Sequence, residues 1–206
     1  MAVKLYPDNP DMKAIDNIVS LLRDGGIIIY PTDTVYAIGC DIRQARAVER
    51  ICHFKKIDSK KARFTMLCDD ISSASEYARI DNDTFKLLKA NLPGPFTFIL
   101  NGSSRLPKLL KNRNTIGIRI PDNNIIRTIV RELGNPMLTT SLKNLDMQSD
   151  YEPEYETDPE LIEEKYGKIV DMVIDGGIGS TIASTVVDCT GDGIEIVRQG
   201  NVSLKY

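Results

Sequence analysis

Residues 25–40 read GGIIIYPTDTVYAIGC, and this stretch decides the fold and the first candidate site. The apolar run 27–30 is bounded by Gly-Gly and by a proline, which is the pattern of a buried core strand that Pro31 ends. Four polar side chains then leave the sheet together: Thr32, Asp33, Thr34 and Tyr36. Open α/β sheets hold ligands beyond their strand ends, so this exit is a candidate binding site. An ordinary turn is the alternative, because Pro, Asp and Thr are common turn residues.

Helix and strand patterns alternate on both sides of this strand. Apolar residues at helical spacing between Asp11 and Gly25 predict a helix that ends just before the core strand. Further helices are expected around 45–51, 85–88 and 125–133, and strands over 64–68, 96–100, 115–120, 137–140, 169–174, 185–189 and 194–198. The last two strands are close enough for a hairpin, so the sheet should be mixed. The sequence therefore predicts a single α/β domain over residues 1–206.

Composition excludes several classes of protein. The chain has 206 residues, 42% of them hydrophobic, which suits one large core. No stretch approaches the roughly 20 apolar residues that span a bilayer, so we expect a soluble cytoplasmic protein with no membrane partner. The four cysteines are widely spaced without a C-x-x-C pair, which predicts reduced core thiols: Cys40, Cys52, Cys68 and Cys189. With His53 as the single histidine, no protein-held metal is expected.

Charge is segregated along the chain although the net charge is only −3. Residues 43–63, the basic stretch, hold eight Lys or Arg against two acids, and residues 146–164, the acidic stretch, hold nine Asp or Glu and no Lys or Arg. The basic stretch is expected to attract anions such as phosphate, with a solvated helix face as the alternative. The acidic stretch is expected to be a solvated excursion.

Arg119 is the most informative single cation. Strand alternation over 115–120 places Thr115, Gly117 and Arg119 on one face and three isoleucines on the other. If both faces are covered, Arg119 is buried, and it must then pair internally or receive an anionic ligand. Common nucleotide and hydrolase motifs, the P-loop, G-x-G-x-x-G and G-x-S-x-G, are absent from the sequence.

Taken together, these motifs resemble a known family. GGIIIYPTDTVYAIGC, Lys55 in the basic stretch, TIGIRIP (115–121), PMLTTS (136–141), STVVD (184–188) and IVRQG (196–200) are similar to the YrdC-like family. Its best-known members make threonylcarbamoyl-AMP from threonine, bicarbonate and ATP for tRNA modification. PDNP (7–10), YPTDT before YAIGC, and TTSL look most like the YciO branch. The resemblance covers nearly the whole chain and implies a twisted, open, mixed and largely antiparallel sheet, flanked by helices, with a basic concave face.

The resemblance also implies a residue set for each ligand, without assigning a catalytic residue. Thr32, Thr34, Arg119, Thr139 and Ser184 would surround a threonine-like amino acid, with Arg119 at its carboxylate. Lys55, Thr115, Ser141 and Arg198 would lie along the nucleotide, with Lys55 and Arg198 at its phosphates. ATP would be a substrate and would bring Mg²⁺ with it.

Two departures from the family pattern weaken the expected activity. The K-x-R motif is Lys55-Lys56-Ile57 here, and the S-x-N motif is Ser141-Leu142-Lys143. Each removes a polar contact worth roughly 1.5 to 3 kcal/mol, so turnover should fall by orders of magnitude unless another cation compensates. The candidates for compensation are Lys56, Lys60, Lys61, Arg63 and Lys143.

A different class of function is the alternative to catalysis. Double-stranded RNA, or tRNA, would bind a track made by the basic stretch with Lys108, Lys111 and Arg113. The negative net charge and the lack of tryptophan argue against a dedicated RNA binder. A carbamoyl-nucleotide role like that of related domains in hydrogenase maturation factors is a third reading, and the lack of accompanying zinc-finger or acylphosphatase segments argues against it.

Overall fold

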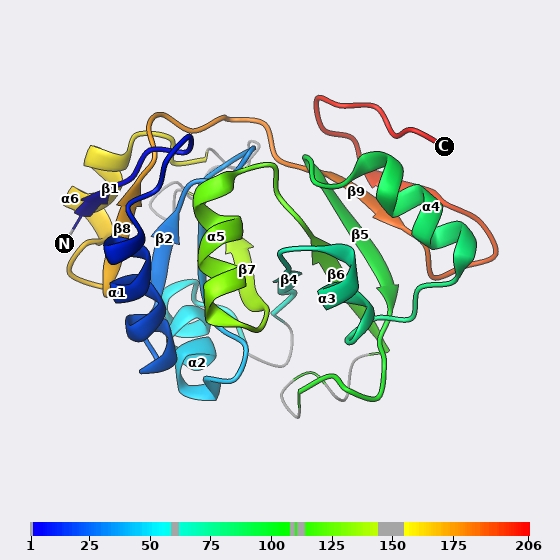
Figure 1. Cartoon of the computed structure of the whole chain (residues 1–206), viewed down its shortest axis with the longest axis horizontal. Coiled ribbons are helices and arrows are strands. Elements are labelled where there is room, and N and C mark those ends of the chain that lie inside the picture. Colours follow the sequence, from blue (N-terminus) through cyan, green and yellow to red (C-terminus); the bar gives the residue numbers. More distant parts are fainter. Residues whose placement is uncertain (1, 59–61, 108–109, 111–113, 144–154) are drawn as a thin grey trace.

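A single open sheet of ten strands runs through the molecule in the order β1-β8-β2-β3-β7-β4-β6-β5-β9-β10 (Figure 1). This computed structural model describes residues 2–58, 62–107, 110, 114–143 and 155–206. The strands are β1 Ala2–Lys4, β2 Ile28–Tyr30, β3 Ala37–Asp41, β4 Thr65–Leu67, β5 Phe96–Asn101, β6 Thr115–Arg119, β7 Met137–Ser141, β8 Met172–Asp175, β9 Thr185–Asp188 and β10 Glu195–Arg198. The helices are α1 Met12–Arg23, α2 Ala45–Phe54, α3 Ile71–Ser75, α4 Asn82–Asn91, α5 Asn124–Leu133 and α6 Pro159–Tyr166.

The sheet is mixed, as the sequence predicted. The pairs β2–β3, β3–β7, β4–β7, β5–β6 and β9–β10 are antiparallel, and the pairs β1–β8, β2–β8, β4–β6 and β5–β9 are parallel. The expected hairpin of the last two strands is confirmed, with Glu195 opposite Asp188. Antiparallel pairs therefore have only a narrow majority.

Helices cover both faces of the sheet, which explains the unbroken apolar run in β2. Ile28 and Tyr30 pack with α1 and α5, and α5 lies in front of β7 in Figure 1. Ile29 points the other way, into a second core that includes residues of α2, α4 and α6. A strand buried on both sides cannot show polar alternation, so it reads as continuous hydrophobic sequence.

Several helix ends follow from single residues. Asp11, Asp81, Asn123 and Asp158 each accept a backbone N–H of the first turn, which satisfies a donor that the helix itself cannot. Gly134 ends α5 with φ of 76°, a left-handed conformation that glycine adopts without strain. These caps fix where α1, α4, α5 and α6 begin, and where α5 ends before β7.

The expectation for the acidic stretch was wrong over its second half. Residues 159–166 form α6, and Ile162 and Tyr166 on that helix are buried. The signal was present in the sequence, because Asp158-Pro159 is a common helix start and Ile162 and Tyr166 are four residues apart. Residues 144–154 of this region lie outside the described part of the chain. The strand expected over 169–174 begins only at Met172, and Ile169 is exposed.

The cysteine prediction is confirmed. Cys40, Cys52 and Cys68 are buried, Cys189 is partly buried, and none of the four is in a disulfide. No helix in the described ranges has the length and apolar character needed to cross a bilayer.

Candidate functional site

A polar strip crosses the middle of the sheet on the face that carries α1 and α5. Four residues stand side by side on neighbouring strands: Gly39 in β3, Thr139 in β7, Thr65 in β4 and Gly117 in β6. Strands lie about 4.8 Å apart, so these four positions span roughly 14 Å. A Cβ on Gly117 would meet the side chains of Thr65 at 3.3 Å and of Thr97 in β5 at 3.4 Å. The two threonines therefore pack closely around Gly117, and we call Gly39, Thr65, Thr97, Gly117 and Thr139 the polar strip.

Tyr30 orients one hydroxyl of this strip. Its phenol donates a hydrogen bond to Thr139 Oγ1 at 2.5 Å. Gly39 makes this possible, since a Cβ there would lie 2.9 Å from the Tyr30 hydroxyl oxygen. Burial raises the pKa of Tyr30 well above its usual value, so the phenol keeps its proton and acts as a donor. The proton of Thr139 must then point elsewhere, and the carbonyl oxygen of Ile38 lies 3.4 Å away.

The first charged group beside the strip is the arginine cluster, formed by Thr32, Asp33, Thr34 and Arg119. Arg119 Nη2 donates to Asp33 Oδ1 at 2.6 Å, to Thr34 Oγ1 at 2.6 Å and to Thr32 Oγ1 at 3.0 Å. The side chains of Arg119 and Asp33 are 10% and 9% exposed. Of the two expectations for this cation, internal pairing is the one that the structure shows.

One donor of Arg119 is still unused. Its Nε is buried and has no hydrogen-bond partner within the described ranges. Asp33 is held from a second side, because its Oδ2 accepts the backbone N–H of Asp122 at 3.1 Å. The guanidinium is therefore fixed in place and electrically balanced, yet it keeps its Nε–H for another acceptor.

Ser184, just before β9, and Arg198 in β10 adjoin the strip. The hydroxyls of Ser184 and Thr97 are 2.9 Å apart. Arg198 donates to the carbonyl oxygen of Ser184 through Nε at 3.0 Å and Nη2 at 2.8 Å. In the part of the chain that is described, Arg198 forms no ion pair, so its charge is not balanced by an acid.

The second charged group is the lysine cluster, formed by Lys55, Thr140, Ser141 and Lys143. Lys55 follows α2, and its ammonium donates to Ser141 O at 2.8 Å and to Thr140 Oγ1 at 3.2 Å. Burial, and to a lesser degree the charge of Lys143, lower the pKa of Lys55 to about 8. The Lys143 ammonium lies 5.9 Å from the centre of the Tyr155 ring. Across the described ranges, neither lysine forms an ion pair with a carboxylate.

The structure thus groups most of the expected site residues. Thr32, Thr34 and Arg119 are in direct contact, as are Ser184 with Arg198 and Lys55 with Ser141, while Thr139 lies in the strip. Thr115 stands apart, exposed at the start of β6 opposite Asn101. Sequence reasoning missed Tyr30, Thr65 and Thr97. The signal for the two threonines was a single polar residue inside an otherwise apolar strand, which is a weak one.

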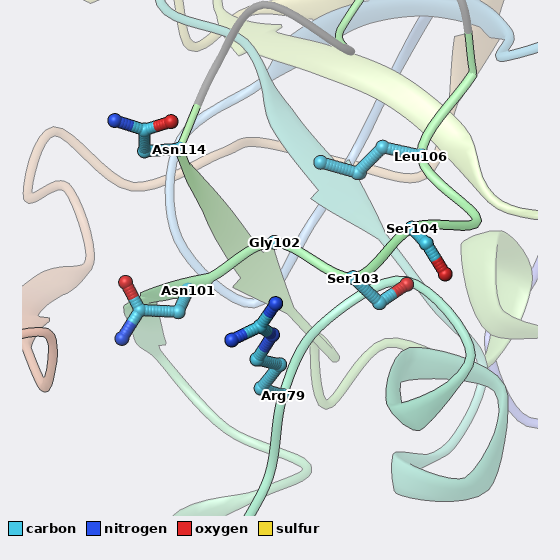
Figure 2. Close-up of a pocket in the computed structure, with 7 residues that line it drawn as sticks. All are labelled: Arg79, Asn101, Gly102, Ser103, Ser104, Leu106 and Asn114. Carbon is cyan, nitrogen blue, oxygen red and sulfur yellow. The ribbon is translucent and has the colours of Figure 1, made fainter.

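Two open pockets lie outside the strip. The larger, about 660 Å³, is at the far end of β5 and is lined by Arg79, Asn101, Gly102, Ser103, Ser104, Leu106 and Asn114 (Figure 2). The smaller, about 280 Å³, includes Asp33, Asp122 and Lys205, so it adjoins the arginine cluster. Within the described part of the chain, no three His, Cys, Asp or Glu side chains are grouped to hold a metal.

The basic stretch is only partly available to an anion. Arg50 forms an ion pair with Asp171 at 2.8 Å, and Lys55 belongs to the lysine cluster. Five residues of the expected RNA track lie outside the described residues: Lys60, Lys61, Lys108, Lys111 and Arg113. RNA binding therefore stays a prediction.

Comparison with known proteins places these residues in context. The sequence profile of the Sua5/YciO/YrdC family, described as "Telomere recombination", matches residues 20–200. The chain is 41% identical to the uncharacterized protein YciO of Escherichia coli strain K12, over 95% of this chain and 93% of that protein. The crystal structure of E. coli YciO superposes with a TM-score of 0.89, covering 100% of this chain and 98% of the other.

More distant relatives carry a functional name. A putative threonylcarbamoyl-AMP synthase of Methanocaldococcus jannaschii is 29% identical over 98% of this chain and 94% of that protein. The crystal structure of P. abyssi Sua5 in complex with L-threonine has a TM-score of 0.85 at 22% identity, covering 97% of this chain and 57% of that one. At that identity the likeness concerns the fold.

Proposed function

The chain belongs to the Sua5/YciO/YrdC family, and on that premise we propose that it is an L-threonylcarbamoyladenylate synthase acting in tRNA modification. Its substrates would be ATP, bicarbonate and a small amino acid of the threonine type. The observation that carries the proposal is a pair of cationic clusters, one beside the polar strip and one at the end of β7 that follows Thr139. Among the residues that the structure describes, one cluster is balanced by an acid and the other is not.

The arginine cluster suits an amino acid. A zwitterion carries a carboxylate and an ammonium group, and the cluster offers a free Arg119 N–H beside the Asp33 carboxylate. The hydroxyls of Thr32 and Thr34 add further polar groups within 3.2 Å of each other. The Arg119–Asp33 ion pair carries no net charge, and neither does a zwitterionic amino acid. Binding therefore leaves no buried charge without an opposite charge beside it.

The lysine cluster suits the nucleotide, because the reaction moves negative charge onto the pyrophosphate that leaves. The amine of the amino acid would attack the carbon of bicarbonate, giving a carbamate and water. A carbamate oxygen would then attack the α-phosphorus of ATP, and pyrophosphate would leave with its electron pair. Fixed cations such as Lys55 and Arg198 stabilise charge that moves onto the leaving group, so no covalent nucleophile is needed. Mg²⁺ would arrive bound to ATP.

The proposal is tested by measuring conversion of ATP to pyrophosphate with threonine and bicarbonate each left out in turn. We expect turnover that needs both compounds, and it should be slow because Ile57 stands where the family pattern has arginine. Pyrophosphate release that ignores either compound, or no ATP binding at all, would reject the reaction. Tight RNA binding that falls steeply with salt and ignores ATP would favour the alternative function.

A further inference from the structure

Residues 176–184, the crossing segment, join β8 to β9. In Figure 1 the segment runs in orange along the top of the molecule, from one half of the sheet to the other. Its middle lies against the exit of β2, because the Ser180 N–H donates to Thr34 O at 3.1 Å. Its last residue is Ser184, whose carbonyl oxygen accepts two hydrogen bonds from Arg198. The crossing segment therefore connects the arginine cluster to Arg198.

The hydroxyl of Tyr36 anchors the beginning of the crossing segment. It donates to Gly177 O at 2.7 Å and accepts the Gly176 N–H at 3.3 Å, so one phenol holds two neighbouring residues. Tyr36 is fully buried, and burial raises its pKa to about 12. The phenol therefore keeps the proton that it donates at any pH near neutral.

The ring of Tyr36 fixes the middle of the crossing segment. A Cβ on Gly179 would lie 2.7 Å from Cδ2 of this ring, a distance that only glycine avoids without a shift. The Gly179 N–H also donates to Thr157 O at 2.8 Å, which holds the backbone in this place. Hydroxyl and ring together set the path of the segment toward Ser184.

We infer that Tyr36 is a positioning residue for the amino-acid end of the site, and that it acts through the crossing segment. Thr34 and Ser184 are buried, so their side chains follow the backbone that carries them. A displacement of about 1 Å among groups that hold a substrate can lower activity about a hundredfold, so an anchor away from the ligand matters. This role rests on the proposed function for the identity of the ligand as a threonine-like amino acid.

Titrations of the full chain with threonine and, separately, with ATP test this role. We expect Tyr36→Phe to bind threonine about fivefold more weakly, the effect of one lost hydrogen bond, and ATP within about twofold of wild type, because the lysine cluster is unchanged. Gly179→Ala displaces the segment from the same ring and should give the same difference between the two ligands. Tyr77→Phe and Gly191→Ala are the matched controls and should change neither affinity. Among the described residues, nothing lies within 4 Å of a Cβ placed on Gly191.

Affinity separates positioning from a purely structural role. A lower melting temperature of Tyr36→Phe with both affinities unchanged would overturn the positioning role, and so would equal weakening of threonine and ATP. Hydrogen exchange over residues 177–184 should be faster in Tyr36→Phe than in wild type, and unchanged exchange would likewise overturn it. Gly179→Ala supplies the test if Tyr36→Phe does not fold.

The same titrations distinguish this role from the proposed reaction. Weaker threonine binding in both variants, without pyrophosphate release by wild type, would support the positioning role and reject the reaction. Turnover that needs threonine in wild type, with unchanged threonine affinity in both variants, would overturn the positioning role alone. If wild type binds no threonine, both fail.

Discussion

The arginine cluster lies beside the polar strip and the lysine cluster lies at the end of β7, and the two are built differently. Arg119 is almost fully buried and is paired with Asp33 at 2.6 Å. Lys55 is partly buried, and in the described part of the chain it donates to a hydroxyl and a carbonyl oxygen. The first arrangement holds a cation in place whether or not a ligand is bound. The second leaves net positive charge for the ligand to balance, so folding and binding should depend on these two cations in opposite ways.

The largest expected effect is on stability, at the arginine cluster. Arg119→Ala leaves Asp33 buried without its partner, and breaking one side of a buried pair destabilises proteins by about 3 to 5 kcal/mol. Lys55→Met should change the free energy of unfolding by less than about 1 kcal/mol or raise it, because it removes a partly desolvated charge. Urea unfolding measures both. A control, Arg119→Gln with Asp33→Asn, should recover part of the loss, and equal effects of the two single variants would contradict the comparison.

The second largest expected effect is on ligand binding. Here the change at Lys55, and not the change at Arg119, should have the larger effect on ATP affinity. Lys55→Met should lower ATP affinity by about 1.5 to 3 kcal/mol, the usual contribution of a hydrogen bond to a charged group. Threonine affinity should stay within about twofold, because the arginine cluster is untouched. Titration calorimetry with each ligand separately makes the measurement. If Lys55→Met weakens threonine and spares ATP, the two clusters have been assigned the wrong way round.

Part of the fold and of the site could be predicted from the sequence, as these same residues show. The core strand, the α/β class and the mixed sheet follow from apolar runs and turn residues, which are local signals. Arg119 was expected to be buried if both faces of the sheet are covered, because strand alternation determines its face. Its pairing with Asp33 was left open, since the partner is 86 positions away in the chain.

The neighbours of Gly117 in the site could not be predicted from the local sequence pattern. Thr65 and Thr97 become neighbours of Gly117 only through strand order, which skips from β4 to β6 and then to β5. The contacts of Gly117 are between segments that are distant in the sequence, and no propensity reports such a contact. The helix α6 was missed for a different reason. Its many acidic residues favoured a solvated segment over the helix that the spacing of Ile162 and Tyr166 indicates.

The two clusters should also differ in how pH changes ligand affinity. The pKa of Lys55 is lowered to about 8, so above that value its ammonium loses a proton and ATP affinity should fall. Stability should move the other way between about pH 8 and the ordinary lysine range near 10, because there the unfolded chain holds the proton that the folded protein has released. Titrations at pH 7 and 9.5 should show the fall in wild type and lose most of it in Lys55→Met. A fall that persists in the variant would assign it to another group.

The smallest expected effect concerns the hydroxyl between the two clusters. Tyr30→Phe removes the donor to Thr139 Oγ1 and should lower the free energy of unfolding by about 1 to 2 kcal/mol, the penalty for leaving a buried acceptor unsatisfied. Because Thr139 is then free to reorient, its proton can turn into the space left by the phenol oxygen, and the strip loses a donor of fixed direction. We expect a weaker threonine affinity with unchanged ATP affinity. Tyr77→Phe, at a partly buried tyrosine outside the strip, is the matched control and should change neither. If Tyr30→Phe weakens both ligands equally, the strip acts as one undivided surface, and the division into two clusters does not hold.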